Sequence, residues 1–178
     1  ADGAHIYHIL FLRYLLYPII LCMTKARMCI LIAVMFMKNS REILTSVLKT
    51  TQMGQIGIRS VLDTRMRPGL KDALTSQLKE YDALESEAHT LATQRGWELP
   101  ELDPAARAMA SMMTRVKLQM GGNDSKIADM MIQGNTKGMI KSLKLMHRLP
   151  REDSQISALS QKLLDTENAN IRQMQAFL

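Results

Sequence analysis

The residues of this chain that could carry chemistry are acids and amides on the apolar stripes of expected helices. In the last stretch of the sequence, Ile156, Leu159 and Leu163 continue at helical spacing through Glu167 and Asn170. Some helix bundles hold two metal ions with inward Glu-x-x-His pairs, and here asparagine stands where histidine is expected. Three further helices carry the other candidates, which are Gln52, Glu80, Glu85 and Gln133. These six positions predict either an altered iron or manganese site or a hydrogen-bond network.

The choice between the two depends on how well amides bind metal ions. Amides are weak metal ligands compared with carboxylates and imidazoles, whereas amide, carboxyl and phenol groups satisfy one another well inside a bundle. Tyr81 follows Glu80 directly and His89 lies one turn after Glu85, so several such groups occur on one helix. We therefore prefer the hydrogen-bond network. The alternative is a metal site centred on Glu80, Glu85 and Glu167.

The composition favours an all-α protein that does not bind nucleic acid. Aromatic residues make up only 4% of the 178 residues and fifteen are methionine, a balance that suits helical cores better than β-sheets. The net charge of +6 is dispersed, because lysine and arginine alternate with acids along most of the chain. Both cysteines lie in the first 37 residues, which fits a reducing compartment, so we expect a cytoplasmic protein.

A helix-bundle domain is expected over residues 38–178, with five helices. Their expected ranges are 39–64, 68–95, 103–120, 125–146 and 154–177. The boundaries depend on residues that begin or end helices, namely Asn39, Pro68, Gly96, Asp103 and either Asp124 or Ser125. The first two and the last two helices form hairpins, and roughly thirty residues with a short helix connect them. Such a long crossover indicates a bundle that is not simply up-down-up-down.

Residues 1–37 differ from the rest because they form two apolar runs around a polar break at 24–27. The first run contains Arg13, and the second is about half as long as a bilayer requires. A secretory signal does not fit, since no charged start and no small-residue cleavage site flank the first run. Three interpretations stay open: translation from a misplaced start upstream of Met37, a membrane anchor, or an apolar helix packed on the domain.

Three segments look like those of small uncharacterised ferritin-like proteins of Firmicutes. They are SQLKEY at 76–81, ADMMIQGN at 128–135 and ENANI at 167–171, and the likeness covers about 39–178. The resemblance implies a ferritin-like antiparallel four-helix bundle, often dimeric, with a diiron centre in its catalytic and storage members. It places the ligand positions near Gln52, Glu80, Gln133, Glu167 and Asn170. Amides stand at three of these positions and histidine at none, which argues against ferroxidase, oxygenase and iron-storage activity.

The leading hypothesis is a non-enzymatic bundle without a cofactor that acts through protein association, as a homodimer. One alternative is an iron- or manganese-binding oxidoreductase or storage protein that uses the six candidate positions. Another is a bundle that is membrane-associated through residues 6–37.

Overall fold

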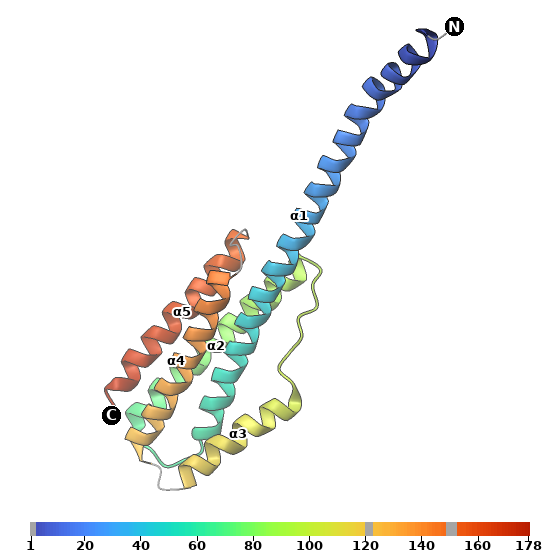
Figure 1. The fold of residues 1–178 in the computed structure, drawn as a ribbon. Coiled ribbons are helices and arrows are strands. Elements are labelled where there is room, and N and C mark those ends of the chain that lie inside the picture. The colour runs from blue at the N-terminus through green and yellow to red at the C-terminus, as the bar shows by residue number, and fades with distance from the viewer. Residues whose placement is uncertain (1–2, 120–122, 149–152) are drawn as a thin grey trace. The chain divides into compact units, whose positions relative to one another are not determined.

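The computed structural model describes the backbone of residues 3–119, 123–148 and 153–178, and side chains mainly from residue 28 onward. Its helices are α1 (Gly3–Val61), α2 (Pro68–Gln94), α3 (Pro104–Gln119), α4 (Asp124–Arg148) and α5 (Ser154–Gln175) (Figure 1). No strand occurs in these described ranges, so the predicted all-α class is confirmed. The chain divides into two compact units, Ala1–Lys38 and Asn39–Leu178, and the core lies in the second.

The first unit consists of the initial part of α1. The side chains of the apolar run at 5–23 lie outside the described residues, so the interpretation of that run stays a prediction. In the second run, the described apolar side chains are exposed, among them Met28, Leu31 and Met35. No helix in the described part of the chain combines the length and the apolar character that crossing a membrane requires.

The sequence predicts a helix start at Asn39, and this prediction is wrong. Helix α1 runs without interruption from Gly3 to Val61, so Asn39 lies inside it. No glycine or proline occurs between Pro18 and Gly54, and most residues there tolerate a helix well. A cap-type residue starts a helix only where the preceding chain leaves the helical conformation, which does not happen here.

The ends of α2 and the start of α3 lie where the sequence predicts them. Pro68 is the first residue of α2, and Gly96 follows its end with a φ of +64°, a conformation that glycine adopts without strain. Asp103 caps α3, because its carboxylate accepts a hydrogen bond from the backbone N–H of Ala105 at 2.7 Å. These breaks separate α2 from α3 by a connection that lacks helical structure.

Asn123, and not the predicted Asp124 or Ser125, caps α4. The side-chain oxygen of Asn123 accepts a hydrogen bond from the backbone N–H of Lys126 at 2.9 Å. The carboxylate of Asp124 is instead paired with the guanidinium group of Arg67, which directly precedes α2. The start of α4 is thereby joined to the turn between α1 and α2.

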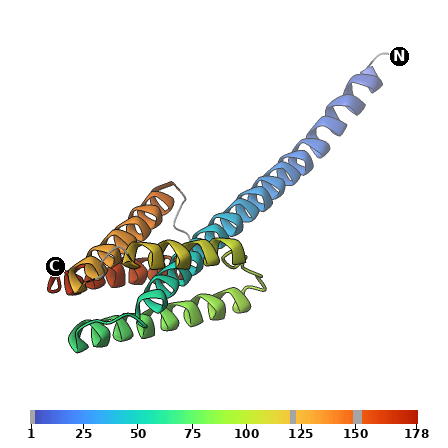
Figure 2. The same cartoon turned by 90° about the horizontal axis from the view of Figure 1, so that it is seen from below.

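The core of Asn39–Leu178 is built from α1, α2, α4 and α5. Helices α4 and α5 lie side by side and antiparallel, and α2 packs along α5 (Figures 1 and 2). Figure 1 shows α2 and α4 running in the same direction, because the connection with α3 lies between them. The predicted stripe of α5 is confirmed at every position, since all six residues are buried: Ile156, Leu159, Leu163, Glu167, Asn170 and Met174.

The methionine run that begins with Met109, Met112, Met113 and Met120 recurs largely at helical spacing, which by itself favours core positions. The two methionines of α3 with described side chains are not in the core. Met109 and Met112 are 65% and 69% exposed. Met113 and Met120 belong to the same expected run, and their side chains lie outside the described residues. Among the described residues, α3 adds no side chain to the buried core, because α1, α2, α4 and α5 already fill it. Periodicity predicts an apolar face but not its partner.

Replacing Asp153 is expected to cost stability in two separable parts. Its carboxylate caps α5 by accepting from the backbone N–H groups of Gln155 and Ile156 at 3.1 Å, and it binds Arg95 in a bidentate pair at 2.8 and 2.9 Å. Loss of the cap costs about 1 kcal/mol, and loss of the partly buried ion pair roughly 1–2 kcal/mol more.

Urea denaturation checks this expectation. Asp153→Ala should lose both parts, whereas Asp153→Ser should keep the cap and lose only the ion pair. Asp165→Ala, on the exposed face of α5, is the control and should change the free energy of unfolding by less than about 0.5 kcal/mol. Equal losses for the alanine and serine variants would show that Asp153 does not cap α5.

Candidate functional site

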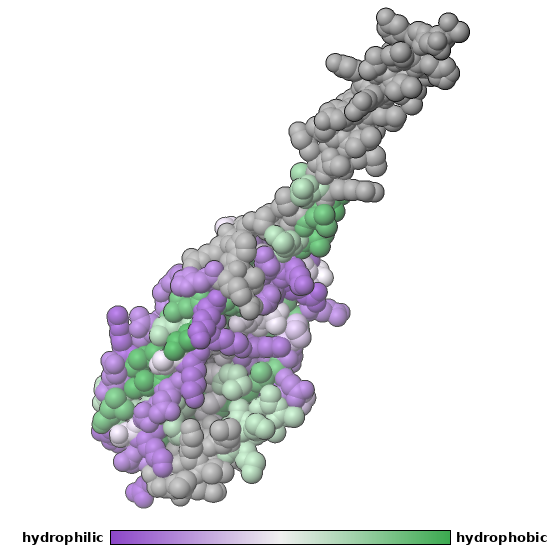
Figure 3. All heavy atoms as spheres, in the orientation of Figure 1, coloured by the Kyte–Doolittle hydropathy of each residue, from purple (hydrophilic) through white to green (hydrophobic). Residues whose placement is uncertain are grey.

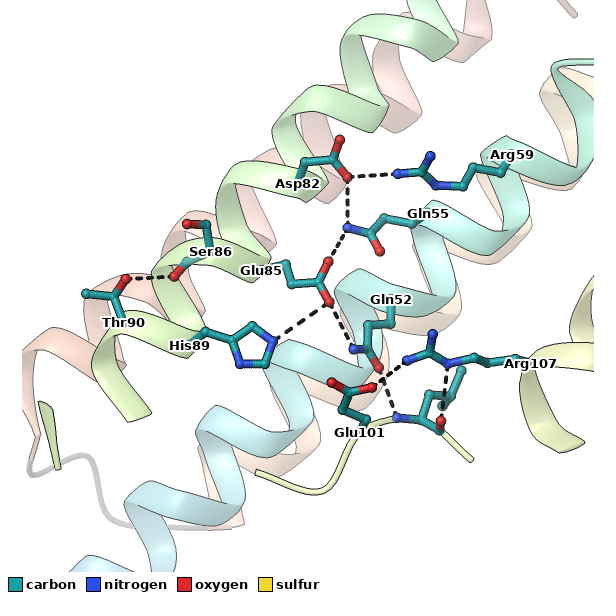
Figure 4. A network of polar contacts seen from close by, with 11 residues as sticks. Gln52, Gln55, Arg59, Asp82, Glu85, Ser86, His89, Thr90, Glu101 and Arg107 are labelled. Atoms are coloured by element: carbon teal, nitrogen blue, oxygen red, sulfur yellow. Dashed lines mark hydrogen bonds and ion pairs between the residues drawn. The ribbon is translucent and has the colours of Figure 1, made fainter. Parts of the chain in front are cut away.

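Two of the six candidate ligands, Gln52 and Glu85, meet in a polar network between α1 and α2 (Figure 4). Nε2 of Gln52 donates to Oε1 of Glu85 at 2.9 Å, and Nε2 of Gln55 donates to Oε2 at 2.6 Å. Partial burial by itself raises the pKa of Glu85, but these amide hydrogen bonds, together with the charges of His89 and Arg107, outweigh it and hold the pKa below its ordinary value. Both Glu85 oxygens therefore accept from amides of α1.

Gln52 also holds the connection that follows α2. Its Oε1 accepts from the backbone N–H of Leu102 at 2.9 Å. Arg107, in the first turn of α3, donates to the carbonyl oxygen of Leu102 at 3.2 Å and to Glu101 at 3.0 Å. One buried amide thus joins α1, α2 and the connection. The contacts of Gln52 and Glu85 therefore place the connection against the helices.

Glu167 and Asn170 of α5 lie in a different place, in a buried cluster with Tyr81 and Asn135. All four residues are at most 7% exposed. With its amide nitrogen turned toward the cluster, Asn135 donates to Oη of Tyr81 and to Oε2 of Glu167, both at 3.2 Å. The Tyr81 hydroxyl also interacts with Glu167, and Asn170 approaches it without reaching strict hydrogen-bonding geometry. Polar groups of α2, α4 and α5 therefore meet inside the core.

Burial determines the charge of this cluster. Burial raises the pKa of Glu167 to about 8, and the hydrogen bond with Tyr81 opposes that rise only in part. Burial also raises the pKa of Tyr81 well above its ordinary value, and the nearby Glu167 raises it further. Both groups are therefore mainly neutral at pH 7. A neutral carboxyl group is a hydrogen-bond donor as well as an acceptor.

A cavity of about 440 Å³ lies between α1 and α4, next to the buried cluster. Glu167 and Asn135 form part of its wall, and Gln133 is also among its lining residues. Apolar side chains provide much of the remaining lining, including Met53, Leu102, Ala110, Met130 and Met131. Four glycines complete it, two from α1 and two from α4: Gly54, Gly57, Gly134 and Gly138. The connection and α3 thus contribute to the same cavity as the two helices.

The glycines make room for different neighbours. A Cβ atom on Gly54 would lie 2.6 Å from the ring of Tyr81, and one on Gly138 would lie 3.0 Å from Oε1 of Glu167. These two glycines allow the cluster residues to approach α1 and α4. A Cβ atom on Gly134 would have no atom within 4 Å, so there is open space beside this exposed glycine, which also lines the cavity.

The remaining candidates, Glu80 and Gln133, are exposed, so the sequence-based placement of both on inward faces is wrong. Partial burial of its carboxyl group raises the pKa of Glu80. The side-chain amide of Gln133 donates a hydrogen bond to Asp129 on its own helix at 2.8 Å. Adjacent helix positions differ by about 100° around the axis. Glu80 therefore points away from the core that Tyr81 enters.

The six candidate ligands do not form one site. Gln52 and Glu85 belong to the α1–α2 network, Glu167 and Asn170 belong to the buried cluster, and the other two are exposed. Among the described residues, no group of three or more His, Cys, Asp and Glu side chains is placed to hold a metal ion. These donors do not fit the dinuclear centre that the resemblance implies, and the metal site stays a prediction.

Asn135 and the glycines of α4 are the site residues that sequence reasoning missed. In the sequence analysis Asn135 is named only as the last residue of the segment ADMMIQGN at 128–135. Gly134 and Gly138 are one helical turn apart, and this spacing is the signal that could have predicted a close approach of other side chains to α4. Comparison with protein-family models, with curated proteins and with solved structures found no match.

Proposed function

We propose that this protein is a non-enzymatic helical bundle that binds a small molecule in the cavity between α1 and α4. The observation that carries the proposal is the cavity of about 440 Å³ with a neutral, buried carboxyl group in its wall. Ligand sites in proteins have volumes of roughly 300–1,000 Å³ and are mainly apolar with a few polar groups that orient the ligand. Glu167 and Asn135 supply such groups here.

The residues around the cavity are better suited to binding a small molecule than to catalysing a reaction. A carboxyl group with a raised pKa can transfer protons, but Glu167 is engaged with Tyr81 and Asn135, and its burial keeps it mainly neutral although the hydrogen bond with Tyr81 opposes this. Its polar neighbours are amide and phenol groups, which are hydrogen-bond partners rather than nucleophiles at neutral pH. The cluster is therefore suited to orienting a bound molecule.

Protein association is a second candidate function, as a homodimer or with another partner. The observation in its favour is the exposure of Met109 and Met112 on α3. Methionine is common at adaptable binding surfaces, because its side chain is flexible and polarisable. A ferritin-like arrangement of the bundle belongs to the same proposal and is supported by the helix order, in which a connection with a short helix separates two hairpins.

Filling the cavity is expected to weaken the binding of a neutral apolar probe. N-phenyl-1-naphthylamine should bind the wild-type chain saturably at one site, measured by its fluorescence. Gly134→Leu should weaken binding by about tenfold or more, a loss of about 1.4 kcal/mol, because leucine occupies the open space beside α4.

The matched control is Ala83→Leu, which adds the same side chain at an exposed position on α2. It should bind the probe as the wild type does, and circular dichroism should show that both variants are folded. Probe binding that is unchanged in Gly134→Leu, or absent from the wild type, would overturn the proposed function.

A further inference from the structure

A second and wider depression shares part of its lining with the cavity. This second hollow, of about 790 Å³, also lies between α1 and α4. The shared residues are Lys49, Lys137 and Lys141, so these three lysines border both spaces. The other lining residues are Glu42, Thr45, Ser46, Ile140, Lys144 and Leu145. We call this depression the lysine groove.

The lysine groove has an excess of positive charge. Lys137, Lys141 and Lys144 follow one another at spacings of four and three residues, which puts them on one face of α4. Lys49 adds a fourth positive charge from α1, and Glu42 is the acid in the lining. Among the described side chains, the ion pairs involve other cations and none of these four lysines. Their charges are available to an anionic ligand.

Two buried hydroxyl groups near the lysines lack a hydrogen-bond partner among the described residues. Ser46 lines the lysine groove and Thr50 lines the cavity, and they are only 8% and 6% exposed. Buried polar groups are nearly always hydrogen-bonded in native proteins, so these two hydroxyl groups, like four other buried polar atoms of the described residues, retain unused hydrogen-bonding capacity.

The two spaces differ in the chemistry that they offer. Both spaces are lined by Lys49, Lys137 and Lys141, and each adds its own groups: Lys144 and hydroxyl groups in the lysine groove, methionines, glycines and the neutral carboxyl of Glu167 in the cavity. Figure 3 shows hydrophilic residues over much of the helical unit on the face drawn, with hydrophobic residues between them. An anionic group at the shared lysines, joined to an apolar chain beside the methionines of the cavity, would match this lining.

We infer, on the basis of the proposed function, that the ligand is a free single-chain amphiphile with an anionic headgroup. Its carboxylate or phosphate group lies among Lys49, Lys137 and Lys141, where it accepts hydrogen bonds from the ammonium groups and nearby hydroxyls. Its apolar chain fills the cavity between α1 and α4. A cationic amphiphile is repelled by the lysines, and a neutral one leaves their charges unneutralised.

The test is isothermal titration calorimetry of the whole chain with four probes below their micelle concentrations: dodecanoate, dodecyl phosphate, dodecanol and dodecyltrimethylammonium. The anionic probes are expected to bind one per chain, at least about tenfold more tightly than dodecanol. Added salt should weaken the anionic probes more than dodecanol, because it screens exposed charges. Dodecyltrimethylammonium should bind most weakly.

Variants separate the headgroup from the chain. The double variant Lys137→Gln, Lys141→Gln should remove the preference for dodecanoate over dodecanol, whereas Lys71→Gln, Lys79→Gln on the exposed face of α2 should keep it. Gly134→Leu should weaken both dodecanoate and dodecanol. If Gly134→Leu leaves dodecanoate binding unchanged, the ligand occupies the lysine groove alone and the inference fails.

The outcomes also distinguish this inference from the function on which it depends. If dodecanol binds in the cavity as tightly as dodecanoate, the anionic class is wrong while small-molecule binding stands. If neither these probes nor the neutral fluorophore binds, the proposed function is wrong as well. Binding to vesicles of phosphatidylglycerol without binding of the free anionic probes would assign the lysines to a membrane surface and overturn the inference.

Discussion

The free energy of unfolding should fall by several kcal/mol between about pH 5 and pH 8, because Glu167 holds its proton in the folded chain. Its pKa is raised from 4.5 to about 8, so across this window the folded chain binds a proton that the unfolded chain has lost. Stability must then decrease as the pH rises. The gap between the two pKa values sets a ceiling of about 5 kcal/mol. Below pH 4.5 and above pH 8 this group adds no slope.

Glu167→Gln tests the prediction, because glutamine has nearly the same shape and carries no charge at any pH. Urea denaturation at intervals from pH 4.5 to pH 9 should show the slope in the wild type and a much flatter profile in the variant. The variant should be the more stable protein at pH 9. Glu98→Gln, at an exposed position in the connection, should keep the wild-type slope. Parallel profiles for the wild type and Glu167→Gln would mean that Glu167 titrates normally.

Adding one methyl group should have opposite effects at two glycines of the cavity. Gly134→Ala should stabilise the chain by about 0.5–1 kcal/mol, since alanine favours a helix and the new Cβ meets no atom within 4 Å. Gly54→Ala should destabilise it, because the Cβ would lie 2.6 Å from the Tyr81 ring, which is almost fully buried. Overpacking of this kind costs about 1–3 kcal/mol, more than the helical gain.

Gly57→Ala is the matched control for both, because it lies one turn after Gly54 on the same helix. Its Cβ would be 3.8 Å from the terminal carbon of Met131, an ordinary contact, so a small gain in stability is expected. Thermal and urea denaturation of the three variants should therefore separate Gly54→Ala from the other two. A stable Gly54→Ala would show that the Tyr81 ring does not lie against α1.

Helical periodicity gave the right faces for α5 and most of α2. On α5 it placed both apolar and polar core residues correctly, because every third or fourth position along a straight helix faces the same neighbour. On α2 the apolar positions Leu74, Tyr81 and Leu84 recur at helical spacing and are buried, but Glu80 is one position away from Tyr81 and is exposed. The prediction failed there because a one-residue error in phase turns a side chain by about 100°.

The meeting of Tyr81, Asn135 and Glu167 could not be derived from any single helix. Each residue lies on a different element, and the cluster depends on how α2, α4 and α5 pack in space. The two candidates that form hydrogen bonds between α1 and α2, Gln52 and Glu85, were identifiable as buried or partly buried polar groups. Their partner at Leu102 was not, because a backbone group in an irregular connection leaves no pattern in the sequence.

At Gly134, selection for stability and selection for ligand binding favour different residues. Alanine or another good helix former would strengthen α4, and the surrounding space would accept a small side chain without strain. The same atoms would take volume from the cavity. A lineage selected only for heat resistance is therefore expected to abandon glycine at this position early, whereas a lineage that depends on a bound molecule must tolerate the weaker helix in order to keep the space.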